Sequence, residues 1–422
     1  MLDRKYIREH AQEIKENTKK FFLPESLVDD FLALDESSRK AKLDLDNLRK
    51  ERNTVSEAIN TAKKEGKDAA EFLAKAKELP GQIKAAEEAY VAVEGKARAL
   101  LLKIPNIIDQ ETPIGKDDSH NIVKEVIGSP EERSFELKNH VQLTEELGVA
   151  DFATAATTSG NGFFYLKGQL AELNQALIRF ALDKMIEKGY EFVEPPLMIR
   201  KNILDGLVNT EEFEQSIYTI EGEDLHLIAT SEHPLIGLFT NKTLRKADLP
   251  IKLVGYSACF RKEIGSHGID EKGLFRTHQF YKVEQIIICE PKDSRYFFKE
   301  IQANQIELFK ELRLPLRIVD ICTGDMGVMK SRMSDLEAFA PRQGYVEVGS
   351  CSNLTAAQAR RLNIRYEGDG KIDFVHTLNN TAIATSRAMV AILEYYQNED
   401  GSVSIPSVLR PYMRNKERIE KK

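Results

Sequence analysis

Long apolar runs are missing from this sequence. No run of 18 or more apolar residues occurs among its 422 residues, and the N-terminal MLDRKYIREH is charged from its third residue. A helix that crosses a bilayer needs about 20 mostly apolar residues, and a secretory signal needs an apolar core behind its first charges. We therefore expect neither a membrane span nor a secretory signal, and we expect a cytoplasmic location.

Cysteine is scarce and widely spaced. The four cysteines lie 30, 33 and 29 residues apart: Cys259, Cys289, Cys322 and Cys351. This spacing fits neither a CxxC metal clip nor a compact disulfide framework. We expect four reduced, buried thiols.

An excess of basic residues is also missing. The chain has 60 Lys and Arg against 67 Asp and Glu, a formal net charge of −7. Proteins that bind nucleic acid without sequence preference are usually basic, because the neutralisation of phosphates supplies much of their affinity. Composition therefore argues against RNA binding unless a local basic surface reverses it.

The two commonest nucleotide-binding signatures are absent. No G-x-G-x-x-G opens a helix after a strand, and residues 324–331 only approach a Walker A loop, because Met329 stands where its second glycine must lie. That glycine lets the backbone wrap around a phosphate. We interpret the near-match as chance.

What the sequence does have is a long helical repeat near its N-terminus. Residues 1–103 are rich in Ala, Lys, Glu, Asp and Leu. Two stripes, almost entirely apolar, recur at steps averaging 3.5 residues: Leu34, Ser38, Ala41, Leu45, Leu48, Arg52, Val55, Ile59 and Ala62, then Phe72, Ala76, Leu79, Ile83, Ala86, Tyr90, Val93, Ala97 and Leu100. Such a stripe stays on one helix face only if two helices supercoil. We predict an antiparallel helical hairpin that turns at residues 63–68, with a kink or a late helix start at Pro80.

The purpose of the hairpin stays open from its residues alone. Coiled coils are typical of dimerisation and spacer elements as well as of RNA-binding arms. Its basic residues fit an RNA-binding surface or an ordinary solvated face equally well: Arg39, Lys40, Lys42, Arg49, Lys50, Arg52, Lys63 and Lys64.

The remainder of the chain has a different texture. A chain of this length exceeds one ordinary core, so we expect two domains. Three helical stretches (169–188, 296–311 and 383–396) alternate with β-rich runs (251–256, 281–289, 316–321 and 344–350) without a regular βαβ rhythm. This order predicts an α+β domain, an antiparallel sheet with helices packed on it.

The most informative block is residues 260–285. It reads as a strand, a glycine-containing loop with Gly265, Gly268 and Gly273, and a returning strand. Arg261 and Arg276 stand at its two ends, so a hairpin would bring both guanidinium groups to one place. Guanidinium forks match phosphate oxygens, and Phe280 offers a face on which a base could stack. A surface hairpin with ordinary charges is the alternative.

Three further stretches carry suitable side chains. Thr230-Ser231-Glu232 follows a strand-like run and could clasp an ammonium group. Glu347 and Ser350 lie near a strand end and offer the oxygen ligands that Mg²⁺ prefers. Residues 376–381 lead into a helix that carries Arg387. Each stretch alone would usually be an ordinary surface feature, and their coincidence favours a site for a nucleotide and an amino acid.

Taken together, these stretches resemble the seryl-tRNA synthetases, from residue 1 to about residue 397. The first class II motif resembles residues 189–197, with its proline at Pro196; the second resembles residues 260–280; and the third ends at Arg387. The resemblance implies a coiled-coil tRNA arm over 1–105, a linker over 106–134 and a class II catalytic domain over 135–422. It also implies a homodimer built through the first motif.

The resemblance implies roles at the ATP site. Arg261 would bind the α-phosphate, Arg276 the outer phosphates, and Phe280 with Arg387 would enclose the adenine; these three arginines are the expected catalytic residues. Glu347 and Ser350 would hold Mg²⁺. The full set expected to contact ATP is Arg261, Lys262, Glu263, Thr277, Phe280, Glu347, Val348, Gly349, Ser350 and Arg387.

It also implies a serine site. Thr230 and Glu232 would hold the serine ammonium group, and Glu284 and Thr381 would receive its hydroxyl. The full set expected there is Thr230, Ser231, Glu232, Arg261, Glu284, Asn379 and Thr381. Two of the departures from the family pattern lie close to this site: Thr381 replaces a frequent Ser, and Gly349 a common Ser. No cysteine lies near Thr230–Glu232, so we expect no zinc.

The implied activity is a serine–tRNA ligase that forms seryl-adenylate from L-serine and ATP and charges tRNA(Ser), and also tRNA(Sec) where it is present. Two alternatives remain. An amino acid:carrier-protein ligase would keep adenylation but lack the arm, and a non-catalytic RNA-binding paralogue would be expected to lose the motif arginines, which are present here.

Overall fold

The computed structural model describes residues 1–209, 215–263 and 273–421. It divides into two compact units, Met1–Pro105 and Asn106–Lys422. The loop glycines Gly265 and Gly268 lie outside the described residues.

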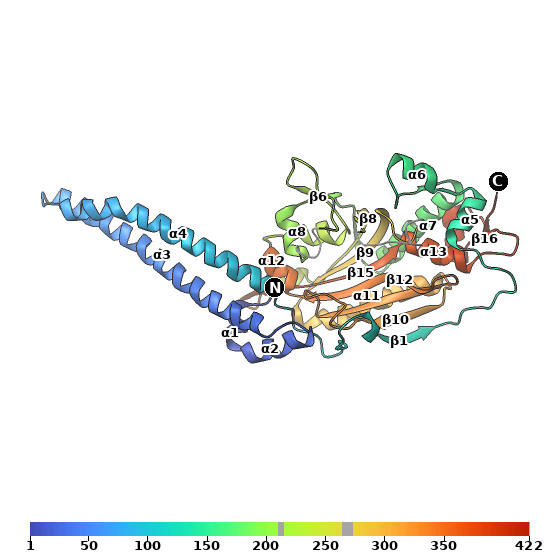
Figure 1. The fold of residues 1–422 in the computed structure, drawn as a ribbon, viewed down its shortest axis with the longest axis horizontal. Coiled ribbons are helices and arrows are strands. Elements are labelled where there is room, and N and C mark those ends of the chain that lie inside the picture. The colour runs from blue at the N-terminus through green and yellow to red at the C-terminus, as the bar shows by residue number, and fades with distance from the viewer. Residues whose placement is uncertain (210–214, 264–272, 422) are drawn as a thin grey trace. The chain divides into compact units, whose positions relative to one another are not determined.

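The first unit is helical. Its helices are α1 (Arg4–Glu9), α2 (Ala11–Lys20), α3 (Ser26–Lys64) and α4 (Ala70–Lys103). Figure 1 shows α3 and α4 side by side along their length, joined at one tip. The predicted antiparallel hairpin is confirmed.

The apolar stripes form the contact between α3 and α4. Leu45 and Val55 of α3 and Leu79 and Ala97 of α4 are buried. Arg52, one of the two polar members of the first stripe, is exposed. Polar contacts extend the pairing, because Ser38 Oγ donates to a Glu94 oxygen at 2.7 Å and Arg49 pairs with Glu87 at 3.0 Å.

Pro80 lies inside α4 rather than at its start. The helix begins at Ala70, ten residues earlier, so the expectation of a late start is wrong. Proline removes one backbone donor, but Leu79, 1% exposed, remains buried against α3 beside it. Packing along the seam outweighs the local helix-breaking tendency of proline.

The second unit is built on an eight-stranded sheet with the order β1-β10-β11-β12-β15-β9-β8-β4. Only the edge pair β4–β8 is parallel. The strands are β1 (Ile122–Ile127), β4 (Glu191–Val193), β8 (Ile251–Phe260), β9 (Gln279–Cys289), β10 (Leu316–Asp320), β11 (Arg332–Ala340), β12 (Gly344–Thr355) and β15 (His376–Ala384). The α+β class with an antiparallel sheet is confirmed.

Smaller sheets and short helices complete this unit. The remaining strands are β2 (Ala150–Asp151), β3 (Tyr165–Leu166), β5 (Met198–Arg200), β6 (Leu225–Leu227), β7 (Thr243–Arg245), β13 (Arg365–Gly368), β14 (Lys371–Phe374), β16 (Val403–Ser404) and β17 (Arg418–Ile419). The helices are α5 (His140–Leu147), α6 (Phe152–Thr158), α7 (Gly168–Glu187), α8 (Lys201–Leu207), α10 (Glu232–Gly237), α11 (Ser294–Glu311), α12 (Ala357–Leu362) and α13 (Thr385–Tyr395). Short 3-10 helices are η1 (Asp118–His120), η2 (Lys246–Asp248), η4 (Pro291–Asp293) and η5 (Ser407–Met413).

The two faces of the large sheet have different covers. One face packs on the main core with α7, α11 and α13, to which β9 contributes Val283 and Ile287. The other face packs on a smaller core with α8, α10 and α12, to which β9 contributes Ile286 and Ile288. This alternation follows from the two-residue period of a strand, and the second face is only partly covered by apolar residues.

The segment 106–134 is more structured than the expected linker. It contains η1 and β1, and β1 pairs antiparallel with β10 as an edge strand of the large sheet. Asn106 anchors its start, because the side-chain amide donates to Met329 O at 3.0 Å and to Leu354 O at 2.9 Å.

The expectation drawn from the scarce cysteines is confirmed. All four cysteines are free and buried, as predicted. Among the described residues, the helices include none that combines the length and the apolar character needed to cross a membrane.

Leu45→Ala should destabilise the arm by about 2–5 kcal/mol, because Leu45 is 1% exposed and its removal leaves a cavity in the seam. Leu43→Ala on the same helix is the matched control: Leu43 is 61% exposed, so its loss should stay within about 0.5 kcal/mol. Hydrogen exchange of the α3 amides in the full chain measures both. Equal exchange rates in the two variants would contradict the burial of Leu45 in the contact between α3 and α4.

Candidate active site

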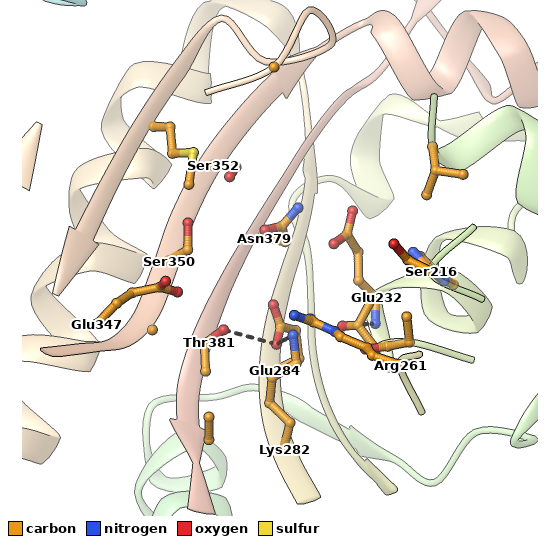
Figure 2. Close-up of a pocket in the computed structure, with 18 of the residues that line it drawn as sticks. Ser216, Glu232, Arg261, Lys282, Glu284, Glu347, Ser350, Ser352, Asn379 and Thr381 are labelled. Atoms are coloured by element: carbon orange, nitrogen blue, oxygen red, sulfur yellow. Dashed lines mark hydrogen bonds and ion pairs between the residues drawn. The ribbon is translucent and has the colours of Figure 1, made fainter. Parts of the chain in front are cut away.

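A cavity of about 590 Å³ opens on the partly covered face of the large sheet. Figure 2 shows strands carrying charged and hydroxyl side chains into it. Of the residues expected from sequence, the following line it: Thr230, Glu232, Arg261, Glu263, Arg276, Thr277, Phe280, Glu284, Glu347, Val348, Gly349, Ser350, Asn379, Thr381 and Arg387.

Two expected residues are not among those that line the cavity. Ser231 is fully buried, and its hydroxyl donates to Gly255 O at 3.3 Å. Lys262 directs its ammonium group over the ring of Tyr218, 5.8 Å from the centroid. The structure gives Ser231 a packing role and places the Lys262 ammonium beside an aromatic ring.

The register of β9 selects which of its side chains face the cavity. Lys282 and Glu284 share the strand face of Ile286 and point into the cavity, whereas Val283 and Ile287 point into the main core. The strand period of two residues makes this division. A carboxylate thereby reaches the floor of the cavity on a rigid central strand.

Glu284 is held by a cation and a hydroxyl. Lys282 Nζ lies 2.7 Å from a Glu284 oxygen, with both side chains under 10% exposed. Thr381, its direct partner across β9 and β15, donates a hydrogen bond to the same carboxylate at 3.3 Å. Figure 2 shows both contacts. The arrangement presents a carboxylate beside a hydroxyl, which suits a ligand hydroxyl.

A β-bulge brings Glu347 and Ser350 to one face. They are three residues apart, so an unbroken strand would turn them to opposite faces. The β11 partners of Glu347 and Gly349 are consecutive residues, which makes Val348 the extra residue of the bulge. Glu347 and Ser350 consequently both face the cavity (Figure 2).

Glu347 is paired with Arg387. Arg387 Nη1 lies 2.9 Å from a Glu347 carboxylate oxygen and donates to the Glu347 carbonyl at 2.9 Å. Burial raises the pKa of Glu347, but the Arg387 guanidinium outweighs burial, and the pKa lies below its ordinary value. The carboxylate is ionised at neutral pH.

Glu347 and Ser350 together fit a magnesium ion. The Ser350 hydroxyl oxygen is buried and has no hydrogen bond of standard geometry within the described part of the chain. Among the described residues, no group of three or more His, Cys, Asp or Glu is arranged to hold a metal. Mg²⁺ is usually held by one or two carboxylates together with water and substrate phosphates. Glu347 and Ser350 would supply only the protein share of such a site.

Glu232 is oriented by a residue that sequence reasoning missed. Gln358 Nε2 donates to Glu232 Oε1 at 2.8 Å, and Thr377 in turn donates to the Gln358 amide oxygen at 2.7 Å. Burial raises the pKa of Glu232, and the nearby Glu284 adds to this shift. The Glu232 carboxylate is therefore costly to ionise without a cationic ligand.

The aromatic contacts differ from the expected pair. Arg387 lies over the ring of Phe275, 5.2 Å from its centroid, and Arg261 lies 5.1 Å from the centroid of Phe280. The enclosure of a base by Phe280 and Arg387 stays a prediction. Phe275 also lines the cavity and was missed, although it directly precedes Arg276.

The structure accounts for glycine at position 349. A Cβ there would lie 2.1 Å from Gln305 Nε2 and 3.0 Å from Thr381 Cβ. Gln305 is buried, so it has little room to move aside. Glycine at 349 is therefore required chiefly by Gln305, and the Thr381 methyl, 3.2 Å from the same Cβ position, adds a smaller restriction.

Lys330 is a further cation of the cavity that sequence reasoning missed. Its ammonium group lies 2.9 Å from Met333 Sδ, and burial lowers its pKa. Burial and the neighbouring Glu347 raise the pKa of Asp335 to about 8. Lys330 belongs to the near-match to a Walker A loop, so that stretch does line the cavity, although not as a phosphate-wrapping loop.

Comparisons with known proteins agree with this geometry. Residues 1–108 match the family described as Seryl-tRNA synthetase N-terminal domain, and residues 213–396 match the tRNA synthetase class II core domain (G, H, P, S and T). A serine–tRNA ligase from Methanoregula boonei is 47% identical over 99% of this chain and 100% of its own length. The chain belongs to the seryl-tRNA synthetase family. The predicted resemblance is confirmed.

Solved structures of seryl-tRNA synthetases share the whole fold. The enzyme from Pyrococcus horikoshii, solved in complex with ATP, superposes with a TM-score of 0.90 at 43% identity and covers 100% of both chains. The cytoplasmic enzyme of Naegleria fowleri, solved with AMP, gives a TM-score of 0.84 at 31% identity over 99% of this chain and 97% of its own.

Lys282→Met should destabilise this seryl-tRNA synthetase by about 3–5 kcal/mol, because it leaves the Glu284 carboxylate buried without its cation. The double variant Lys282→Met/Glu284→Gln should recover most of the loss, since no uncompensated charge remains. Denaturant unfolding of the catalytic unit measures both. If Lys282→Met is as stable as the wild type, Lys282 does not compensate the buried charge of Glu284.

Proposed function

We propose that the protein is a serine–tRNA ligase. It activates L-serine with ATP to seryl-adenylate and pyrophosphate, then transfers the seryl group to the 3′ end of tRNA(Ser), and to tRNA(Sec) where that tRNA is present. The observation that carries the proposal is one cavity that joins guanidinium groups suited to phosphates with a buried Glu284–Thr381 pair suited to a hydroxyl.

Adenylation needs no protein nucleophile. The serine carboxylate attacks the α-phosphorus in line, an O–P bond forms, and the bond to pyrophosphate breaks. Arg261 is assigned to the α-phosphate, Arg276 to the outer phosphates, and Arg387 to the adenine. Catalysis then consists of positioning and of stabilising the charge that develops on the phosphate oxygens.

Glu347 and Ser350 are assigned as the protein ligands of Mg²⁺. When bound, the ion neutralises phosphate charge. Arg387 contributes by holding the Glu347 carboxylate in place and ionised, through the contact at 2.9 Å.

Serine selection is assigned to two groups of residues. Glu232, oriented by Gln358, and Thr230 would hold the ammonium group. Glu284 and Thr381 would receive the side-chain hydroxyl, with Asn379 beside them. An amino acid that lacks the hydroxyl would donate no hydrogen bond to the Glu284 carboxylate. Sites built to bind a substrate hydroxyl strongly reject analogues that lack it.

The N-terminal unit is assigned to tRNA. Its α3–α4 hairpin carries exposed basic residues, among them Lys40, Lys50, Arg52, Lys63 and Lys64. We keep the division into an arm (1–105), a linker (106–134) and a catalytic domain (135–422), together with a cytoplasmic homodimer, as part of the proposal.

Charging assays separate this function from its alternatives. Incubation with ATP, labelled serine and tRNA(Ser) should yield seryl-tRNA, and a carrier-protein thiol should receive no label. Label on the thiol alone would favour the amino acid:carrier-protein ligase. If the protein is folded but forms no adenylate, the remaining interpretation is the non-catalytic RNA-binding paralogue.

Arg261→Ala should lower serine-dependent pyrophosphate–ATP exchange by roughly 10²–10³, the usual loss for a missing transition-state charge contact. Arg245→Ala is the control, since this arginine is exposed and pairs with Asp248. If exchange in Arg261→Ala stays within about threefold of the wild type, the α-phosphate role is wrong.

The KM for serine should rise as the pH falls. Burial raises the pKa of Glu232 above its ordinary value, so as the pH falls through that raised pKa, protonation removes the negative charge opposite the serine ammonium group. Gln358→Met should move this limb to higher pH, because it removes the hydrogen bond that favours the ionised form. Steady-state exchange across pH measures it, and a KM for serine that is flat down to pH 5 would refute the role.

Deletion of residues 36–98 should spare exchange and greatly weaken tRNA charging. The cut ends, Asp35 and Ala99, belong to the paired helices a few residues from Ser38 and Glu94, which share a hydrogen bond of 2.7 Å, so a short glycine linker can join them. Lys63→Glu/Lys64→Glu at the tip is a milder variant. Unchanged charging after the deletion would make the arm a spacer.

A further inference from the structure

His140 lies outside the cavity lining but contacts two segments that build it. It is 5% exposed and is the first residue of α5. Its Nδ1 lies 3.1 Å from Glu394 Oε1, and its Nε2 lies 3.2 Å from the backbone nitrogen of Leu274. No role for His140 follows from the motifs discussed above.

The contacts determine the tautomer of the ring. The Leu274 N–H can only donate, so Nε2 must be the acceptor and the ring proton must sit on Nδ1. That proton is then donated to Glu394. Glu394 is fully buried and also accepts the backbone N–H groups of His140 and Arg342, each at 3.1 Å. The imidazole therefore bridges α13 and the segment that begins at residue 273 as a neutral donor–acceptor.

Gly273 lets the backbone come this close. Its φ is +126°, and a Cβ there would lie 2.3 Å from His140 Nε2 and 2.9 Å from Val141. Any other residue would displace the ring or the main chain. This glycine was one of three noted in the loop of the second motif, and the close approach accounts for it.

The bridged segments carry the residues assigned to ATP. Leu274 directly precedes Phe275 and Arg276, and both line the cavity. Glu394 lies on α13, two turns after Arg387, whose guanidinium lies over the Phe275 ring at 5.2 Å. The His140 bridge and the Arg387–Phe275 contact thus join the same two segments at two points.

We propose that His140 is a positioning residue for ATP: it holds the backbone at Leu274 so that Phe275 and Arg276 meet Arg387 across the nucleotide site. This inference rests on the proposed function. His140 touches no reacting atom, so its loss should act on ATP binding rather than on the serine site or on the chemical step.

Two conservative variants separate the acceptor from the donor. The His140→Gln side chain places an oxygen near the position of Nε2 and can still accept the Leu274 N–H. The His140→Asn side chain ends near the position of Nδ1, so it can bond Glu394 but cannot reach Leu274. Thr144→Val is the matched control, because its buried hydroxyl donates to backbone carbonyls of its own helix, to His140 O at 2.8 Å and to Val141 O at 3.1 Å.

In pyrophosphate exchange, His140→Asn should raise the KM for ATP by about tenfold, equivalent to losing one hydrogen bond. The KM for serine and kcat should stay within about twofold. His140→Gln should lie near the wild type, and Thr144→Val should lower the Tm without changing the KM for ATP. Amides 273–277 should exchange faster only in His140→Asn.

Equal KM values for ATP in His140→Asn and His140→Gln would overturn the inference, as would equal rises in the KM values for ATP and serine. If neither variant folds, the ¹⁵N shifts of the His140 ring in the wild type decide: a proton on Nδ1 supports the bridge and a proton on Nε2 refutes it. Absence of exchange in the wild-type enzyme would instead refute the proposed function, so the two failures are distinguishable.

Discussion

Gathering several carboxylates in one cavity, with Glu284 fully buried among them, is the constraint on which the rest of the site depends. Each ionised carboxylate away from water must be matched by a cation or a hydrogen-bond donor. The scaffold supplies partners to three of the acids that line the cavity: Lys282 and Thr381 to the buried Glu284, Arg387 to the partly exposed Glu347, and the neutral amide of Gln358 to Glu232. Because each partner comes from the scaffold, the carboxylates hold fixed positions before any ligand arrives, which is the condition for electrostatic preorganisation.

The large sheet supplies these positions through strand register. A regular period of two brings Lys282 and Glu284 to the cavity, and the pairing of β9 with β15 sets Thr381 opposite Glu284. On β12 the bulge at Val348 shifts the alternation by one residue, so that Glu347 faces the cavity together with Ser350. The groups assigned to the serine hydroxyl lie on central strands of the sheet, while the segment that begins at Gly273 is held from the side by His140, which accepts the Leu274 N–H.

Sequence reasoning reached the features that have local signatures. A repeat of 3.5 residues predicted the α3–α4 hairpin, and Pro80 misled only about where the second helix begins. The motif arginines, Glu284 and Thr381 could be placed because the family pattern aligns them. Gln358, Lys330 and His140 could not, because each acts on a residue that is far away in sequence or through a fold-dependent contact. The Val348 bulge was also invisible, since it depends on pairing between two strands.

The central claim is that the buried Glu284–Thr381 pair makes this cavity selective for a hydroxyl-bearing amino acid. The most direct measurement is pyrophosphate–ATP exchange with serine and with alanine, compared as kcat/KM. Because alanine lacks the hydroxyl for which the pair is built, the account predicts a preference for serine of about 10⁴–10⁵. Alanine accepted within about tenfold of serine would contradict it.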